Sequence, residues 1–148
     1  MPHLVILYTP QLDDETDMSD LCNDLASTML AAKDEDQKPL FPPGGIRVLA
    51  YPAKHHAVGD GGVAGRNAKL HENNPNGGSG DYAFVYLNVR MAKGRSAVAQ
   101  QHAGEALITT TKRHFEKLFV QRHIGITLQI DEGQEVFDAK HSNLHPLF

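Results

Sequence analysis

Apolar residues mark out four strands along the chain. Leu4–Leu7 is a continuous apolar run, as in a strand that is covered on both faces. A second strand is predicted over residues 46–51, after a break rich in proline and glycine. Aromatic residues alternate with aliphatic ones over 82–89, and a similar alternation returns over 124–130. These two segments are predicted to be the third and fourth strands.

Two helices are predicted between these strands. Apolar residues recur at helical spacing over 17–32, and either Asp17 or Ser19 is a suitable N-cap. A longer helix is predicted over 96–120, with alanine and leucine along one stripe. The polar segment 9–16 is expected to be a turn. Nine of the eighteen acidic residues lie between Asp13 and Asp36, which is typical of a solvated helix face.

The order of elements predicts two βαβ units in one α+β domain that spans residues 1–148. Two such units can pair into one four-stranded sheet with both helices on one face. The second face is then bare and carries large residues, so we expect a homo-oligomer. Residues 52–80, rich in glycine and asparagine, are predicted to be a long loop insertion with a short hairpin as one possibility.

Composition and charge narrow the class of protein. The chain has 148 residues, a net charge of −4 and one cysteine, Cys22, so a disulfide framework and a broad basic face for nucleic acid are excluded. There is no apolar run of the roughly 20 residues that span a bilayer, nor the basic start of a signal peptide. We therefore expect a cytoplasmic protein without a membrane partner.

Pro2 is the first candidate for chemistry. Removal of Met1 is usual before a small second residue, and it would leave a secondary amine at the start of a buried strand. An α-amino group titrates near pH 8, and an apolar or cationic neighbourhood lowers that pKa toward the best working range of a general base. The plain alternative is that Pro2 simply follows the initiator methionine.

Two arginines are the next candidates. Arg95 lies between Gly94 and Ser96 at the predicted start of the long helix, where free N–H groups and the helix dipole favour an anion. Its planar fork matches a carboxylate, although an exposed arginine at a turn is the simpler interpretation. Arg47 begins an apolar strand and therefore needs a partner, either a substrate carboxylate or an acid of the first helix.

Other sequence patterns give weaker evidence of a functional site. His141 and His145 have a spacing that suits a metal, but they lie in a tail without a third ligand nearby, and we expect no metal. Residues 59–64 fit G-x-G-x-x-A without an apolar helix after them, so a dinucleotide site is not expected. Cys22 is expected to be an inert core thiol.

Several short motifs together resemble the 5-carboxymethyl-2-hydroxymuconate isomerase family of the tautomerase superfamily. They are Met1-Pro2-His3, Gly45-Ile46-Arg47, residues 81–86, Gly94-Arg95-Ser96, Gln100-Gln101 with Ala103-Gly104-Glu105, His114-Phe115, and residues 143–148. The resemblance implies a trimer and a reaction without cofactor in the breakdown of homoprotocatechuate. It also implies that Pro2 is the general base and acid, and that Arg47 and Arg95 bind substrate carboxylates, with Ser96 beside them.

The chain also departs from the family. Segment 52–80 is longer than expected, and Leu49 stands where a further basic residue is expected, which weakens recognition of a third carboxylate. The sequence does not separate structural from functional roles for His3 and Tyr82. Two other functions stay open: a non-catalytic trimeric protein that binds anions, and a decarboxylase or dehalogenase that works through the same proline.

Overall fold

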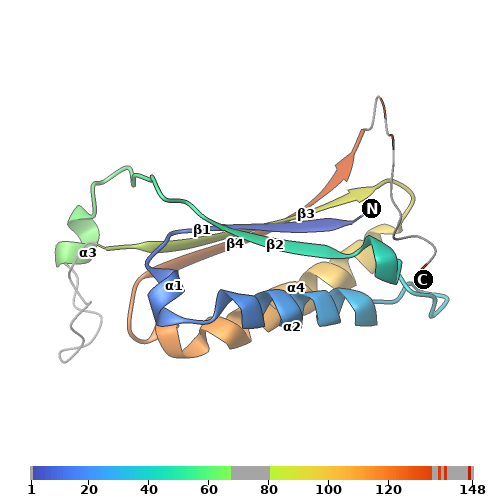
Figure 1. Ribbon diagram of the computed structural model, residues 1–148, viewed down its shortest axis with the longest axis horizontal. Helices are drawn as coiled ribbons and strands as arrows, with labels where there is room; N and C mark the ends of the chain where they lie inside the picture. Colours follow the sequence, from blue (N-terminus) through green and yellow to red (C-terminus); the bar gives the residue numbers. More distant parts are fainter. Residues whose placement is uncertain (1, 68–80, 135–136, 138, 140–146, 148) are drawn as a thin grey trace.

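A four-stranded sheet forms one layer of the molecule and two long helices form the other (Figure 1). The computed structural model describes residues 2–67, 81–134, 137, 139 and 147. The elements in chain order are β1 (His3–Tyr8), α1 (Leu12–Glu15), α2 (Met18–Ala31), η1 (Pro43–Gly45, a 3-10 turn), β2 (Arg47–Pro52), α3 (Val63–Asn67), β3 (Ala83–Ala92), α4 (Ala97–Phe119) and β4 (Ile124–Gly133).

The strand order β2-β1-β3-β4 joins two βαβ units side by side. Strand β1 is parallel to β2, β3 is parallel to β4, and the two central strands are antiparallel to each other. Helices α2 and α4 both cover the same face of the sheet (Figure 1). The predicted α+β architecture is therefore confirmed.

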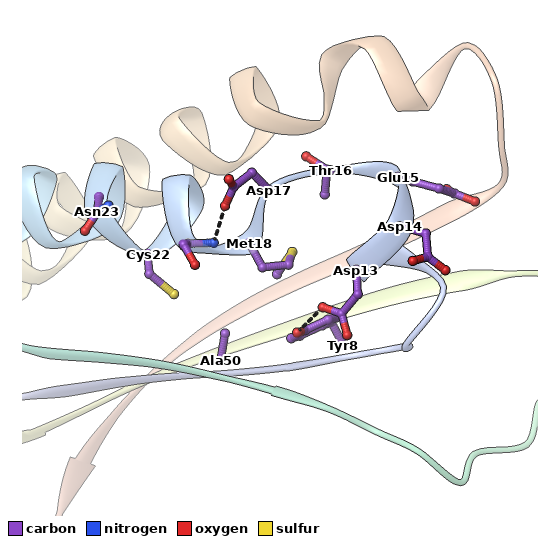
Figure 2. A pocket seen from close by; sticks show the side chains of 11 residues that line it. Tyr8, Asp13, Asp14, Glu15, Thr16, Asp17, Met18, Cys22, Asn23 and Ala50 are labelled. Carbon is purple, nitrogen blue, oxygen red and sulfur yellow. Dashed lines mark hydrogen bonds between the residues drawn. The ribbon is translucent and has the colours of Figure 1, made fainter.

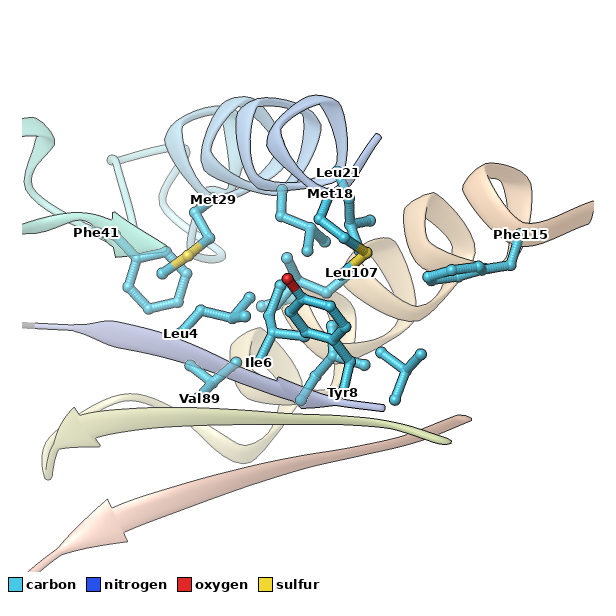
Figure 3. Packing of buried hydrophobic residues seen from close by; sticks show 14 of the residues in the cluster. Leu4, Ile6, Tyr8, Met18, Leu21, Met29, Phe41, Val89, Leu107 and Phe115 are labelled. Carbon is cyan, nitrogen blue, oxygen red and sulfur yellow. The ribbon is translucent and has the colours of Figure 1, made fainter. Parts of the chain in front are cut away.

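Buried and exposed residues alternate along the central strands, which gives the sheet a core face and a bare face. Leu4, Ile6 and Tyr8 of β1 point toward the helices and are at most 5% exposed (Figure 3). Full burial of such a side chain contributes roughly 1.5–3 kcal/mol. Across the helix layer, the residues that meet them are Leu21, Leu25 and Met29 of α2 and Leu107 and Phe115 of α4.

On the opposite face of the sheet, large apolar side chains have no covering layer among the residues that the structure describes. Leu7, Leu49, Tyr51 and Phe84 are each between 41% and 48% exposed. Register places them on one surface, because Leu7 pairs with Tyr51 on one side and with Tyr86 on the other. The bare apolar face expected from the pattern is therefore confirmed.

One local prediction was wrong, and a second is tested only in part. Segment 9–16 is not only a turn: α1 forms within it, because Leu12 is apolar and fully buried. The described part of segment 52–80 contains α3 and no hairpin, and Asp60 holds the turn before α3 by accepting from the N–H groups of Gly62 (2.9 Å) and Ala64 (3.0 Å).

The helix caps and bounds agree with the sequence pattern to within a residue or two. Asp17 is the N-cap of α2 and accepts from the N–H groups of Ser19 (2.8 Å) and Asp20 (3.0 Å). Several predictions fall on residues that lie outside the described ones. These residues are Met1, 68–80 of the long insertion, and most of the tail, including His141, His145 and the 143–146 part of the terminal motif. Within the described part of the chain, no helix is long and apolar enough to cross a membrane.

Candidate active site

The four candidate residues lie at one end of the sheet. Strands β1 and β2 begin there, β3 and β4 end there, and the topology therefore gathers Pro2, Arg47, Arg95 and Ser96 from separate parts of the chain (Figure 1). In the figure this end carries the N label and the short turn η1. The sequence order of the elements is what brings these residues to one edge.

Pro2 is buried immediately before β1. Its ring packs on the backbone of Gly45, because a Cβ atom placed on Gly45 would lie only 3.1 Å from Pro2 Cδ. Gly45 is itself buried at the end of η1. The turn before β2 therefore forms one wall of the space that holds the proline ring.

Arg47 folds back on the turn that precedes it. Its Nη1 donates to the carbonyl oxygens of Gly44 (2.9 Å) and Ile46 (2.8 Å). The alternative of an ion pair with an acid of the first helix is wrong for the described residues, since Arg47 forms no salt bridge there. Among the described residues, Nε and Nη2 of Arg47 make no hydrogen bond. This edge of the guanidinium can therefore donate two parallel hydrogen bonds to one carboxylate.

Arg95 is fixed by backbone carbonyls and an aromatic ring. Nε donates to Leu40 O (3.1 Å), Nη1 donates to Ala92 O (2.9 Å), and the guanidinium carbon lies 5.3 Å from the centre of the Phe41 ring. The side chain is half-buried, so the alternative of an exposed arginine at a turn is wrong. Gly94, with φ of +110°, supplies the left-handed turn that directs the chain into α4.

Ser96 is the N-cap of α4. Its hydroxyl oxygen accepts from the N–H of Ala99 (3.1 Å), and its proton is donated to a carboxylate oxygen of Glu35. This hydrogen bond is the main cause that lowers the pKa of Glu35 below its ordinary value. The single hydroxyl proton is taken by Glu35, so donation from Ser96 to a substrate carboxylate requires Glu35 to move, and the role of Ser96 in binding stays a prediction.

The sequence reasoning missed a polar row on the bare face next to Pro2. His3 pairs with Arg47 on β2 and with Arg90 on β3, so three basic side chains stand abreast. Arg90 Nε donates to Asn88 Oδ1 (2.8 Å), and Asn88 in turn donates to Asp131 (2.7 Å). Alternation along β3 could have revealed Arg90, because it follows Phe84 and Tyr86 on the same face.

A large hollow at the far end of β1 does not suit an anionic ligand. It has a volume of about 820 Å³ and four carboxylates in its lining, from Asp13, Asp14, Glu15 and Asp17, and none of its described lining residues is a lysine or an arginine (Figure 2). Burial and a hydrogen bond to Asp13 (2.6 Å) raise the pKa of Tyr8 to about 12, so this phenol stays neutral. The hollow would repel a carboxylate.

The weaker patterns of the sequence give no site in the described residues. No group of three histidine, cysteine or acidic side chains there could hold a metal ion. Cys22 is half-buried, and burial raises the pKa of its thiol, in agreement with an unreactive cysteine. The N–H groups of Gly62 and Ala64 in the G-x-G-x-x-A segment are taken by Asp60, which leaves them unavailable to a phosphate.

Comparison with known proteins gives a consistent answer over nearly the whole chain. The family model described as 5-carboxymethyl-2-hydroxymuconate isomerase matches residues 2–148. The chain is 28% identical over 148 residues to 5-carboxymethyl-2-hydroxymuconate Delta-isomerase of Escherichia coli, covering 100% of this chain and 99% of the relative.

Solved structures agree with this match. A 5-carboxymethyl-2-hydroxymuconate delta-isomerase superposes with a TM-score of 0.89 at 50% identity, covering 99% of this chain and 92% of the other. A 5-carboxymethyl-2-hydroxymuconate isomerase from Deinococcus radiodurans R1 gives 0.75 at 29% identity, with the same coverage. At 13% identity, covering 98% of both chains, the R7 fused 4-OT shares the fold alone, with a TM-score of 0.50. The chain is an isomerase and belongs to the 5-carboxymethyl-2-hydroxymuconate isomerase family.

Proposed function

We propose that this isomerase converts the enol of 5-carboxymethyl-2-hydroxymuconate, or of a similar anionic 2-hydroxymuconate, to its 2-oxo isomer in homoprotocatechuate breakdown. No cofactor takes part, and Pro2 moves the proton. Membership of the family and the activity for which its relatives are named support the substrate class. The single observation that carries the assignment of the site is the placement of a buried proline and two anchored arginines at one end of the sheet.

The proposed reaction moves one proton in two transfers, first from oxygen to Pro2 and then from Pro2 to carbon. With Met1 removed, the Pro2 nitrogen takes the proton of the 2-hydroxyl group, and the electron pair of the O–H bond forms the new carbon–oxygen double bond. The carbon–carbon double bonds shift along the diene, and the protonated nitrogen returns the proton to a carbon atom. Burial of Pro2 favours the neutral amine, which is the form that acts as a base.

The two arginines are proposed to hold carboxylates in different ways. Arg47 keeps its Nε and Nη2 edge, which can bind both oxygens of one carboxylate. Arg95 uses its Nε proton on Leu40 and one Nη1 proton on Ala92, so its Nε edge is occupied and the second Nη1 proton and the two Nη2 protons remain for a carboxylate that approaches end-on. Positive charge at this end also stabilises the dienolate oxygen that forms in the transition state.

The direct test is to follow ketonisation of 2-hydroxymuconate by ultraviolet absorbance. Protein whose intact mass shows that Met1 is absent should ketonise this dienol well above the rate in buffer. Decarboxylation and dehalogenation substrates, run beside it, should turn over far more slowly. No rate above buffer with any of these substrates would contradict the proposal and favour a protein that binds anions without catalysis.

Replacement of Arg95 with alanine should lower kcat/KM for a dicarboxylate enol by roughly 10- to 100-fold, since a hydrogen bond to a charged group contributes about 1.5–3 kcal/mol. The loss should be much smaller for an enol acid with one carboxylate. Steady-state rates on the two substrates check this, with Arg113→Ala on the exposed face of α4 as the matched control. Equal losses on both substrates would remove the carboxylate role from Arg95.

We also propose that the chain acts as a homotrimer through the bare face of the sheet. The exposed Leu7, Leu49, Tyr51 and Phe84 support this, because burial of such a patch stabilises association. The solved structure of the R7 fused 4-OT is an asymmetric trimer with the same fold.

Sedimentation equilibrium should therefore give three times 16.2 kDa. Leu7→Asp should shift the mass toward that of the monomer, since it places a charge in the centre of the proposed interface. Leu30→Asp, which changes a leucine on α2 that is slightly more exposed than Leu7, should leave the trimer intact. A wild-type protein that sediments as a monomer would contradict the proposed assembly.

A further inference from the structure

The Pro2 ring packs against Gly45, a residue that has no side chain. A Cβ atom on Gly45 would lie 3.1 Å from Pro2 Cδ and 3.1 Å from Pro42 Cγ, a distance tighter than nine in ten real Cβ contacts. Gly45 is therefore enclosed by two proline rings, whose closed covalent structure lets them yield only by a few tenths of an ångström through ring pucker. A side chain at this position must move one of the two rings.

The backbone around Gly45 is held on several sides. Gly45 N–H donates to Pro42 O (2.9 Å), and Ile46 N–H donates to Pro43 O (3.3 Å), which closes the 3-10 turn η1. Arg47 Nη1 binds the carbonyls on both sides of Gly45, those of Gly44 and Ile46. The turn is thus fixed by its own hydrogen bonds and by the arginine that begins β2.

The contact matters for chemistry because Cδ is bonded directly to the ring nitrogen of proline. A shift of Cδ by a few tenths of an ångström moves the nitrogen that is proposed to transfer the proton, and since misplacement by about 1 Å can cost roughly 100-fold in rate, a shift of this size should cost roughly 2- to 5-fold. Displacement of the ring would also expose the amine to more water and bring its pKa closer to that of an ordinary α-amine.

We propose that Gly45 is a positioning residue for Pro2, and that Arg47 acts on the same turn as its clamp. The inference rests on the proposed function, since it concerns the nitrogen that the proposed reaction uses. The absence of a side chain at position 45 sets where the ring nitrogen stands, and the two hydrogen bonds of Arg47 keep the turn from moving away. Arg47 therefore has a structural role beside any contact with a substrate carboxylate.

The test compares Gly45→Ala with Gly59→Ala, a change from glycine to alanine in open space. Both variants and the wild type are labelled with ¹⁵N-proline, and intact mass shows that Met1 is absent. The Pro2 nitrogen is then the single amine among the proline signals, so its titration midpoint is measured without any assay of activity. Gly45→Ala should raise this midpoint and lower kcat roughly 2- to 5-fold with little change in KM, whereas Gly59→Ala should match the wild type.

A double variant, Pro42→Ala with Gly45→Ala, identifies which ring carries the effect. It frees the Pro42 side of the new methyl group but keeps the contact with Pro2, so the raised midpoint should persist. Pro42→Ala alone should leave the midpoint unchanged. If Gly45→Ala does not fold, the double variant takes its place in both measurements.

Two results would overturn the inference. One is a wild-type Pro2 midpoint and kcat in Gly45→Ala, and the other is a return to the wild-type midpoint in the double variant. Failure of the proposed function gives a different result: the wild-type protein then shows no ketonisation, while the effect of Gly45 on the Pro2 midpoint is still measured.

Discussion

Replacement of Pro2 with alanine, in protein that lacks Met1, should slow ketonisation of 2-hydroxymuconate by roughly 100-fold or more while the fold survives. Alanine keeps an α-amine but loses the ring that packs on Gly45. The nitrogen can then rotate about a single bond, so it no longer stands at one position relative to the substrate. Initial rates from ultraviolet absorbance, with intact mass for each sample, measure the loss.

An uncleaved extension in front of Pro2 provides the second arm of this experiment. It converts the Pro2 nitrogen to an amide, which has no basic electron pair, so the contribution of the base should vanish entirely. Thermal melting of both proteins shows whether the core around β1 is intact, since Leu4 and Ile6 are fully buried directly after Pro2. Ketonisation near the wild-type rate with the extension in place would remove Pro2 from the mechanism.

Much of the architecture could be predicted because the central strands have opposite environments on their two faces. In β3 the buried Val85, Leu87 and Val89 alternate with residues of the bare face, and this period of two fixes both the strand and its register. Once the strands and helices are in order, the topology of two βαβ units decides that Pro2 and Arg95 meet at one end of the sheet. No contact between side chains is needed for that inference.

The contacts at the site could not be predicted, because they depend on where the backbone places single atoms. The position of the Pro2 ring depends on the absence of a Cβ atom at Gly45. The sequence does not reveal this, because a glycine after Pro43 and Gly44 is also typical of an ordinary turn. Arg47 binds carbonyls one and three residues before it, and a sequence pattern does not distinguish this from an ion pair. Backbone carbonyls are present at every residue and carry no sequence signal.

A buried ion pair far from the candidate site is a second feature without a sequence signal. Arg122 follows α4, is 3% exposed and binds the carboxylate of Glu15 at the end of α1. It also donates to the backbone carbonyl of Asp81 (2.6 Å), next to the start of β3. Burial alone disfavours the charged guanidinium, but the hydrogen bonds and charges of Glu15 and Asp81 outweigh it and raise the pKa of Arg122. One side chain thus joins three segments that are distant in sequence.

Arg122→Met should therefore lower the free energy of unfolding by about 2 kcal/mol, because it leaves the half-buried Glu15 carboxylate and the Asp81 carbonyl without their charged donor. Arg113→Met is the matched control: its ion pair with Asp24 spans 3.9 Å between side chains that are 69% and 53% exposed, so its loss should cost less than about 1 kcal/mol. Urea unfolding at one fixed protein concentration measures both, since association also contributes to stability. Adding Glu15→Gln to Arg122→Met should restore part of the loss, as the remaining charge is then gone. Equal costs for the two arginine variants would show that Arg122 does not join the three segments in solution.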